Sequence, residues 1–169
     1  MRVLFLSDEL TILLCFIVWP IIQSGCALLM LNLPKRLFHP DHWVYRSHAF
    51  EKEGELYQTL FKVKSWKHLL PDGGAVWRKK GYQKKHLEDY RDENLEKFLV
   101  ESCRGEATHI GPILLFWIFF LFTPFYVGWM MLVYSLIVNM PCIIVQRYNR
   151  PRIKHLLEKH PNRQYKQVG

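Results

Sequence analysis

Two long apolar segments without charge constrain this chain more than any other feature of its sequence. Residues 10–33 and 110–145 contain no Asp, Glu, Lys or Arg, although the chain has 23 basic and 15 acidic residues. A helix rises ~1.5 Å per residue, so the first segment is long enough to cross a ~30 Å hydrocarbon layer. A single straight helix over the second segment would be about 54 Å long, which is too long for one span. We therefore expect an all-α integral membrane protein.

The second apolar segment contains its own signals for a break. Thr123-Pro124 and Gly128 interrupt it, because proline ends a helix and glycine weakens one. We predict transmembrane helices over residues 10–33, 107–123 and 126–145. The tail, residues 146–169, carries seven basic residues and one acidic residue. With three spans, the positive-inside rule places the tail and the polar middle region together in the cytoplasm, in a multi-pass protein of the cell membrane.

The first apolar segment is expected to be a packed transmembrane helix. Gln23, Ser24 and Gly25 form a small polar patch at mid-membrane depth, which indicates that this face packs on protein or on a ligand. A cleaved signal peptide is the alternative, but the apolar run is long and the residues before it are acidic rather than basic. The four cysteines form no C-x-x-C pair, and we interpret them as small apolar side chains.

The polar middle region, residues 35–106, is predicted to form amphipathic helices packed at the cytoplasmic face. Between Phe50 and Trp66, apolar residues share roughly one helical face and lysines alternate with aromatics, as in a helix lying among lipid headgroups. An amphipathic helix on a small soluble domain is the alternative. Residues 84–106 have the clearest helical pattern, and we expect this helix to continue into the membrane. The whole chain, residues 1–169, is expected to form one membrane-embedded domain.

The net charge of +8 indicates an anionic partner. Nucleic acid is one such partner, but a basic tail directly after a membrane span favours anionic lipid headgroups. We therefore expect the chain to contact anionic lipids and not nucleic acid.

Three ionisable residues lie where the helix is expected to enter the bilayer, a position at which such residues are functional candidates. Glu106 and His109 are three residues apart and share a helix face, so the carboxylate can orient the imidazole as a general base. Glu101 lies about 140° round the helix from Glu106, so these carboxylates form a pair only if the helix distorts. A simple cluster of charges at the membrane surface is the alternative.

Two further polar clusters flank the predicted spans. His68 and Asp72 are four residues apart and would form a dyad if the intervening turn folds back, although Asp72-Gly73-Gly74 is also a typical loop. The last span is followed by a run that contains three arginines within six residues. Guanidinium groups bind phosphates and carboxylates bidentately, whereas a membrane anchor needs only the charge. We predict substrate binding by Trp66, Lys67, Arg147, Tyr148, Asn149, Arg150 and Arg152.

Familiar catalytic motifs are missing from the sequence. It has no G-x-S-x-G, P-loop, G-x-G-x-x-G or H-E-x-x-H motif. One Glu–His spacing is too little to indicate a metal site. We therefore predict neither a metal nor a cofactor, and we favour direct transfer or hydrolysis by carboxylates and histidine over a covalent Ser or Cys intermediate.

Several of these motifs, taken together, resemble those of a known family. The resemblance covers roughly residues 25–155, and it is carried by Phe50-Glu51-Lys52 with Gly54, Lys64-Ser65-Trp66-Lys67-His68, Asp72-Gly73, Glu101 through Glu106 to His109, and Ile144-Val145-Gln146-Arg147-Tyr148-Asn149-Arg150-Pro151-Arg152. These residues are similar to those of the glycosyl-4,4'-diaponeurosporenoate acyltransferases, small bacterial membrane enzymes of staphyloxanthin-type carotenoid synthesis. The run from Gln146 to Arg152 is the most specific part.

The resemblance implies an enzyme that acylates a sugar hydroxyl of a glycosylated membrane lipid, with the glycolipid and an acyl donor as its partners. In that chemistry His109 or His68 deprotonates the hydroxyl. Two alternatives stay open. A membrane glycosidase would cleave the glycolipid with Glu106 and a second carboxylate, from Glu51, Asp72 or Glu101. A non-catalytic lipid-binding protein would need none of this chemistry.

Overall fold

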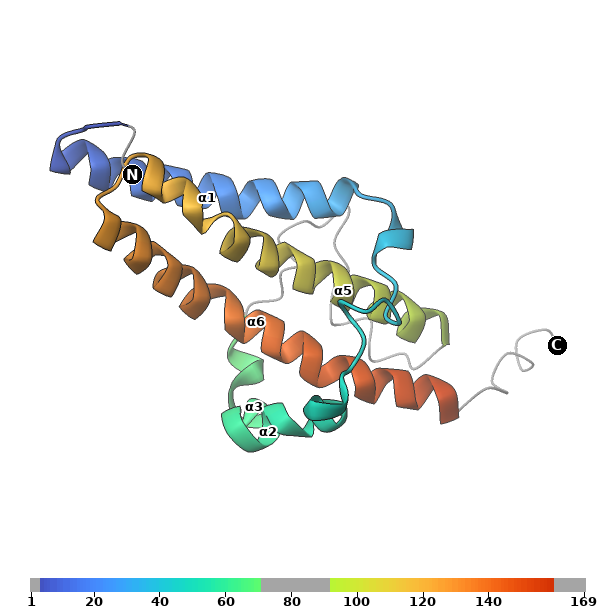
Figure 1. The fold of residues 1–169 in the computed structure, drawn as a ribbon. Coiled ribbons are helices and arrows are strands. Elements are labelled where there is room, and N and C mark those ends of the chain that lie inside the picture. Colours follow the sequence, from blue (N-terminus) through green and yellow to red (C-terminus); the bar gives the residue numbers. More distant parts are fainter. Residues whose placement is uncertain (1–3, 71–91, 160–169) are drawn as a thin grey trace. The chain divides into compact units, whose positions relative to one another are not determined.

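Three long helices dominate the computed structural model, which describes residues 4–70 and 92–159 (Figure 1). They are α1 (Asp8–Asn32), α5 (Asp92–Leu114) and α6 (Phe125–Lys159). No β-strand occurs within the described residues, so the predicted all-α class is confirmed for this part of the chain. Both α1 and α6 have the length and apolar composition of membrane-spanning helices.

Six short helical elements connect the long helices, and the chain divides into two compact units. The short elements are η1 (Lys35–Leu37), η2 (Ala49–Gly54), α2 (Glu55–Phe61), α3 (Val63–Trp66), η3 (Lys67–Leu69) and η5 (Phe116–Leu121), counted within the described ranges. Unit 1 joins Met1–Asn32 to Glu106–Ile143, and unit 2 joins Leu33–Gly105 to Ile144–Gly169.

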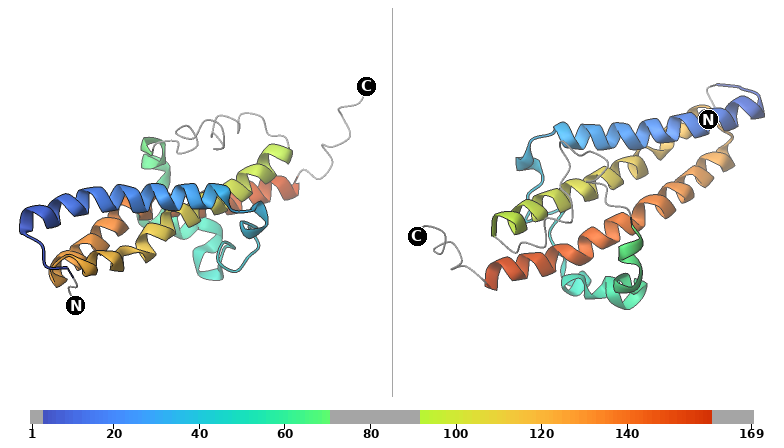
Figure 2. Two further views of the ribbon diagram at one scale, coloured as in Figure 1. Left: turned by 90° about the horizontal axis from the view of Figure 1, so that it is seen from above. Right: turned by 180° about the vertical axis from the view of Figure 1, so that it is seen from behind.

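Unit 1 packs α1 against the end of α5, against η5 and against the first part of α6 (Figures 1 and 2). Trp19 of α1 is central, with its ring centroid 6.3 Å from that of Phe119 and 5.0 Å from that of Tyr134. A Cβ at Gly111 would lie 2.8 Å from the Cys26 Sγ, so the small residue lets α5 approach α1 closely. Of the predicted polar patch, only Gln23 packs on protein, through a hydrogen bond to Asn139, whereas Ser24 and Gly25 are exposed.

The prediction of one helix over residues 107–123 is corrected by the structure. The α-helix ends at Leu114, two residues after Pro112, and continues as the 3-10 helix η5. The predicted break at Thr123-Pro124 is confirmed, because α6 begins at Phe125. Gly128 does not break the chain. It lies inside α6, where a Cβ would come within 2.2 Å of the Phe120 ring, so its role is to admit that ring.

Two other predicted boundaries also differ from the structure. The helix predicted over residues 126–145 continues through the basic run to Lys159. The single amphipathic helix expected between Phe50 and Trp66 is instead broken into short pieces, because Lys52, Glu53 and Lys62 have φ values of 46°, 53° and 49°. A left-handed residue cannot continue a right-handed helix, so each of these positions redirects the chain.

A buried core of unit 2 is formed by α2, α3 and the last part of α6. Val63, Ile144, Val145 and Tyr148 form one buried cluster. In the helix predicted over residues 84–106, the apolar residues Leu87, Tyr90, Leu95, Phe98 and Leu99 recur at helical spacing, and Leu95, Phe98 and Leu99 are buried. Leu87 and Tyr90 lie outside the described residues.

Candidate functional site

A cluster of polar side chains lies between the apolar helices of unit 1. The His109 Nδ1 is 2.9 Å from the Asn139 Oδ1, and the Gln23 Nε2 donates to the same oxygen at 3.2 Å. The three side chains come from α5, α6 and α1, so packing of all three helices builds the cluster. Asn139 and Ser135 are both 0 % exposed. Polar groups in such surroundings are costly and are functional candidates.

The hydrogen bonds of Asn139 fix the tautomer of His109. The Asn139 Nδ2 donates to the Ser135 carbonyl at 2.9 Å, so the Oδ1 is the atom that faces His109. An amide oxygen only accepts, and the His109 Nδ1 must therefore carry the hydrogen. The Nε2 of the neutral ring is then an unprotonated nitrogen with a lone pair, as a general base requires.

The two carboxylates near His109 in sequence have different surroundings. Glu106 lies one turn before His109 on α5 and is 0 % exposed. Glu101 belongs to unit 2, where its Oε1 is 2.5 Å from the Arg104 Nη1. The Glu101 carboxylate is thus neutralised by a neighbour on its own helix.

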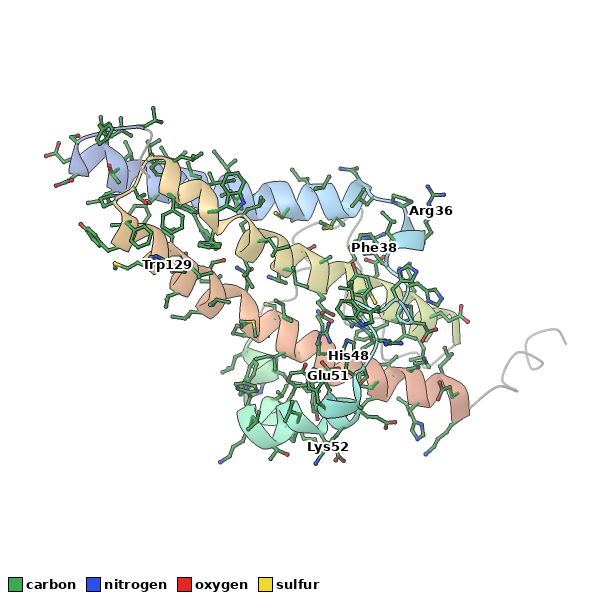
Figure 3. The ribbon with its side chains drawn as sticks, in the orientation of Figure 1. Arg36, Phe38, His48, Glu51, Lys52 and Trp129 are labelled. Atoms are coloured by element: carbon green, nitrogen blue, oxygen red, sulfur yellow. The ribbon has the colours of Figure 1, made fainter. Side chains whose placement is uncertain are left out.

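Glu51 is the best-connected carboxylate of unit 2. Its Oε1 accepts from the Tyr57 hydroxyl at 2.5 Å and from the Arg147 Nη1 at 2.8 Å, and its Oε2 accepts from the His48 N–H at 2.8 Å. Figure 3 shows Glu51 directed toward α6 and Lys52 directed away from it. Burial alone would raise the pKa of Glu51, but the three hydrogen bonds and the Arg147 charge outweigh it and hold the pKa below its ordinary value.

The arginine run on α6 holds the segments of unit 2 together. Arg147 also donates to the Val44 carbonyl. Arg150 is 4 % exposed and donates to the Tyr45 carbonyl at 2.6 Å, to the Ser102 hydroxyl at 2.8 Å and to the Ser102 carbonyl at 3.1 Å. These two guanidinium groups therefore tie α6 to the loop before η2, and Arg150 also ties it to α5.

The remaining predicted binding residues surround Tyr148, which is 1 % exposed. The Arg152 guanidinium lies 3.7 Å from the Tyr148 ring centroid, and the Lys67 Nζ lies 5.3 Å from it. Lys67 also donates to the Asn149 Oδ1 at 3.3 Å. The Trp66 indole donates to the Phe61 carbonyl at 2.7 Å. The structure thus gathers these residues on one side of α6, where cations cover an aromatic face.

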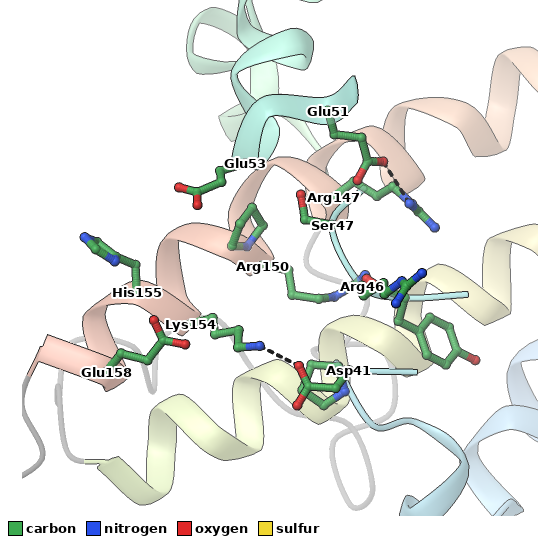
Figure 4. Close-up of a pocket in the computed structure, with 13 residues that line it drawn as sticks. Asp41, Arg46, Ser47, Glu51, Glu53, Arg147, Arg150, Lys154, His155 and Glu158 are labelled. Carbon is green, nitrogen blue, oxygen red and sulfur yellow. Dashed lines mark hydrogen bonds and ion pairs between the residues drawn. The ribbon is translucent and has the colours of Figure 1, made fainter. Parts of the chain in front are cut away.

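A cavity of about 450 Å³ opens in unit 2 between the loop before α2 and the last turns of α6 (Figure 4). Its walls include the Glu51–Arg147 pair and the Asp41–Lys154 pair, together with Arg150. Asp41 and Lys154 were not among the residues singled out from the sequence, because their pairing joins positions far apart in the chain.

The predicted His68–Asp72 dyad stays a prediction. His68 lies on η3 and is exposed, whereas Asp72 lies outside the described residues. Asn139 was missed, although a lone amide in an apolar span is the signal that would have found it. Within residues 4–70 and 92–159, no group of three or more His, Cys, Asp or Glu side chains is arranged to hold a metal ion.

The family model and the related proteins that match this chain carry the same description. The family model of glycosyl-4,4'-diaponeurosporenoate acyltransferase matches residues 41–159. Relatives of that name in Staphylococcus aureus strains bovine RF122 / ET3-1 and MRSA252 are 37% identical over 150 residues, which cover 87% of this chain and 88% of each relative. The relative in strain USA300 is 35% identical over the same length. No solved structure matches the chain. The resemblance seen in the motifs is confirmed, and this membrane-associated chain is an acyltransferase that belongs to the glycosyl-4,4'-diaponeurosporenoate acyltransferase family.

Proposed function

We propose that the chain transfers an acyl group from an activated donor to a sugar hydroxyl of a glycosylated lipid. The relatives are named for glycosyl-4,4'-diaponeurosporenoate, and we propose that lipid as the acceptor here. The observation that carries the proposal is the hydrogen bond between the His109 Nδ1 and the Asn139 Oδ1.

His109 is proposed as the general base. Its Nε2 removes the proton from the sugar hydroxyl as the hydroxyl oxygen attacks the acyl carbonyl. The tetrahedral adduct then collapses, an ester forms, and the imidazolium returns the proton to the departing group, which is a thiol if the donor is a thioester. Asn139 and Gln23 are proposed as positioning residues, because they hold the imidazole in the reactive tautomer.

Glu106 is proposed as a second catalytic group beside His109, on account of its full burial one turn away on the same helix. Cleavage of a glycosidic bond would need a second carboxyl group that can give or take a proton. The Glu51 carboxylate is a weak base and nucleophile because it accepts three hydrogen bonds, one of them from Arg147, and the Glu101 carboxylate is paired with Arg104. These contacts favour acyl transfer over hydrolysis.

Three membrane spans with the polar middle region and the tail on the cytoplasmic face are part of the proposal. The Leu4 N–H donates to the Leu121 carbonyl at 2.9 Å. This hydrogen bond supports placing the start of α1 and the turn between η5 and α6 at the same side of the membrane. Phe116, Phe120 and Trp129 gather beside that turn, as aromatic residues do at a membrane surface. The basic end of α6 would then meet anionic headgroups on the opposite side.

The decisive experiment incubates the purified chain in detergent with glycosyl-4,4'-diaponeurosporenoate and an acyl thioester, and follows the lipid by mass spectrometry. We expect a donor-dependent product that is heavier than the acceptor by the mass of one fatty acid less one water. Free sugar without added donor would mean hydrolysis, and an unchanged lipid would mean binding without catalysis.

Histidine variants test the assignment of the base. His109→Gln should lower turnover about 10²–10⁴-fold, the usual contribution of a general base, with the protein still folded by circular dichroism. His68→Gln is the matched control and should retain activity. The reverse result, a silent His109→Gln and an inactive His68→Gln, would move the base to η3.

A further inference from the structure

The cavity of unit 2 has the size of a small-molecule site. Its volume of about 450 Å³ falls in the range of ~300–1,000 Å³ that such sites occupy. Part of its polar wall is fixed, because Glu51 pairs with Arg147 and Asp41 pairs with Lys154. These pairs already satisfy one another, so they shape the cavity more than they attract a charged ligand.

Four other charged or titratable side chains line the cavity without such partners. Arg46, Glu53, His155 and Glu158 make no side-chain hydrogen bond or ion pair with any part of the chain that the structure describes. They comprise one cation, two carboxylates and an imidazole. Among these four groups, the two carboxylates outnumber the one guanidinium group. Their negative charge disfavours binding of an anionic ligand such as a phosphate or a carboxylate.

The backbone that carries Glu53 is unusual. Lys52, Glu53 and Gly54 are three successive residues with φ values of 46°, 53° and 86°. A Cβ at Gly54 would lie 3.1 Å from the Tyr148 carbonyl oxygen, so this turn is pressed against α6. Non-glycine residues in the left-handed region tend to cluster at functional sites, and here the strained turn brings the Glu53 side chain to the cavity.

We propose that this cavity binds a neutral, hydroxyl-rich ring such as a free sugar, at a site separate from the one where His109 acts. Each sugar hydroxyl both donates and accepts a hydrogen bond, so it satisfies the carboxylates of Glu53 and Glu158 and the guanidinium of Arg46 without adding charge.

The test is binding of methyl glucopyranoside to the full chain in a detergent that contains no sugar, measured by saturation-transfer NMR. We expect transfer to the sugar ring with a dissociation constant on the order of millimolar, as suits so small a ligand. Inorganic phosphate should not displace it. Displacement by phosphate, or binding of phosphate alone, would overturn the proposal.

Charge-neutralising variants give opposite signs for the two kinds of ligand. Glu53→Gln with Glu158→Gln should weaken sugar binding about tenfold, because hydrogen bonds to charged groups are stronger than those to neutral ones. The same variant would strengthen the binding of an anion. Glu55→Gln is the matched control, since Glu55 is exposed in the first turn of α2 and does not line the cavity. Equal sugar binding in all three proteins would refute the proposed site.

The inference and the proposed function fail separately. His109→Gln should lose acyl transfer and keep its affinity for methyl glucopyranoside. If the unmodified chain transfers acyl groups but the cavity variant binds sugar normally, the cavity assignment is wrong and the enzyme assignment stands. If sugar binds in the cavity but no donor yields an acylated lipid, the cavity assignment stands and the enzyme assignment is wrong.

Discussion

Replacing Gly54 by alanine is expected to destabilise unit 2. Gly54 has a φ of +86°, and a Cβ would lie 2.9 Å from the Arg152 Nη1, 3.1 Å from the Tyr148 carbonyl oxygen and 3.2 Å from the Tyr148 Cα. Two of these three atoms belong to the backbone of α6 and cannot move aside cheaply.

The expected cost has two parts. An L-residue in the left-handed region costs about 1–2 kcal/mol. Inserting a methyl group into a filled contact costs about 1–3 kcal/mol. The free energy of unfolding should therefore fall by roughly 2–5 kcal/mol, which for a chain of this size lowers the melting temperature by roughly 5–15 °C.

The assay is thermal unfolding in one detergent, followed by far-ultraviolet circular dichroism. Gly105→Ala is the matched control. Gly105 lies inside α5, and its Cβ would meet only the flexible end of the Gln146 side chain, at 3.3 Å. Helix propensity should make this variant up to about 1 kcal/mol more stable. If Gly54→Ala has the same melting temperature as the unmodified chain, or if both variants lose the same stability, then the expected strain and crowding at Gly54 are absent and the prediction is refuted.

Two further predictions concern the polar contacts of unit 2. The pKa of Glu51 is held below its ordinary value of 4.5, so the contribution of Glu51 to stability is complete above that pH and is lost as the pH falls through the lowered pKa. Glu51→Gln should therefore be less stable than the unmodified chain at neutral pH. Its melting temperature should also vary less between pH 6 and about pH 3. Arg150→Gln should lower the free energy of unfolding by about 3 kcal/mol, because the variant leaves the Tyr45 carbonyl and the Ser102 groups unpaired. Loss of helicity in a urea titration measures this free energy. Normal stability with weakened sugar binding would instead make Arg150 a ligand-binding residue.

The candidate residues could be found from sequence only in part. His109 and Glu106 stand out because ionisable groups beside an apolar segment are costly and therefore rarely accidental. The hydrogen-bond partners of His109 do not stand out, because Asn139 is 30 positions away and Gln23 is 116 positions from Asn139. Which polar side chains meet inside a helical bundle depends on how the helices pack, and one apolar helix face allows several packings.

The arginine run shows the same division. Its composition predicted an anion site, yet Arg147 and Arg150 make hydrogen bonds to Glu51 and to the backbone of a loop about a hundred residues earlier in the chain. A guanidinium group has the same donors for a substrate as for a folded carbonyl, so residue type alone does not separate the two uses.

The sequence by itself determined the apolar helices, the position of the break before Phe125 and the family, because length, absence of charge and a specific run of residues are properties of the linear chain. Only the tertiary structure decided that Gly128 admits a ring, that Lys52, Glu53 and Gly54 form a left-handed turn, and that Asn139 orients His109. Each of these depends on a neighbour distant in sequence or on a backbone angle that packing imposes, and neither is encoded in local periodicity.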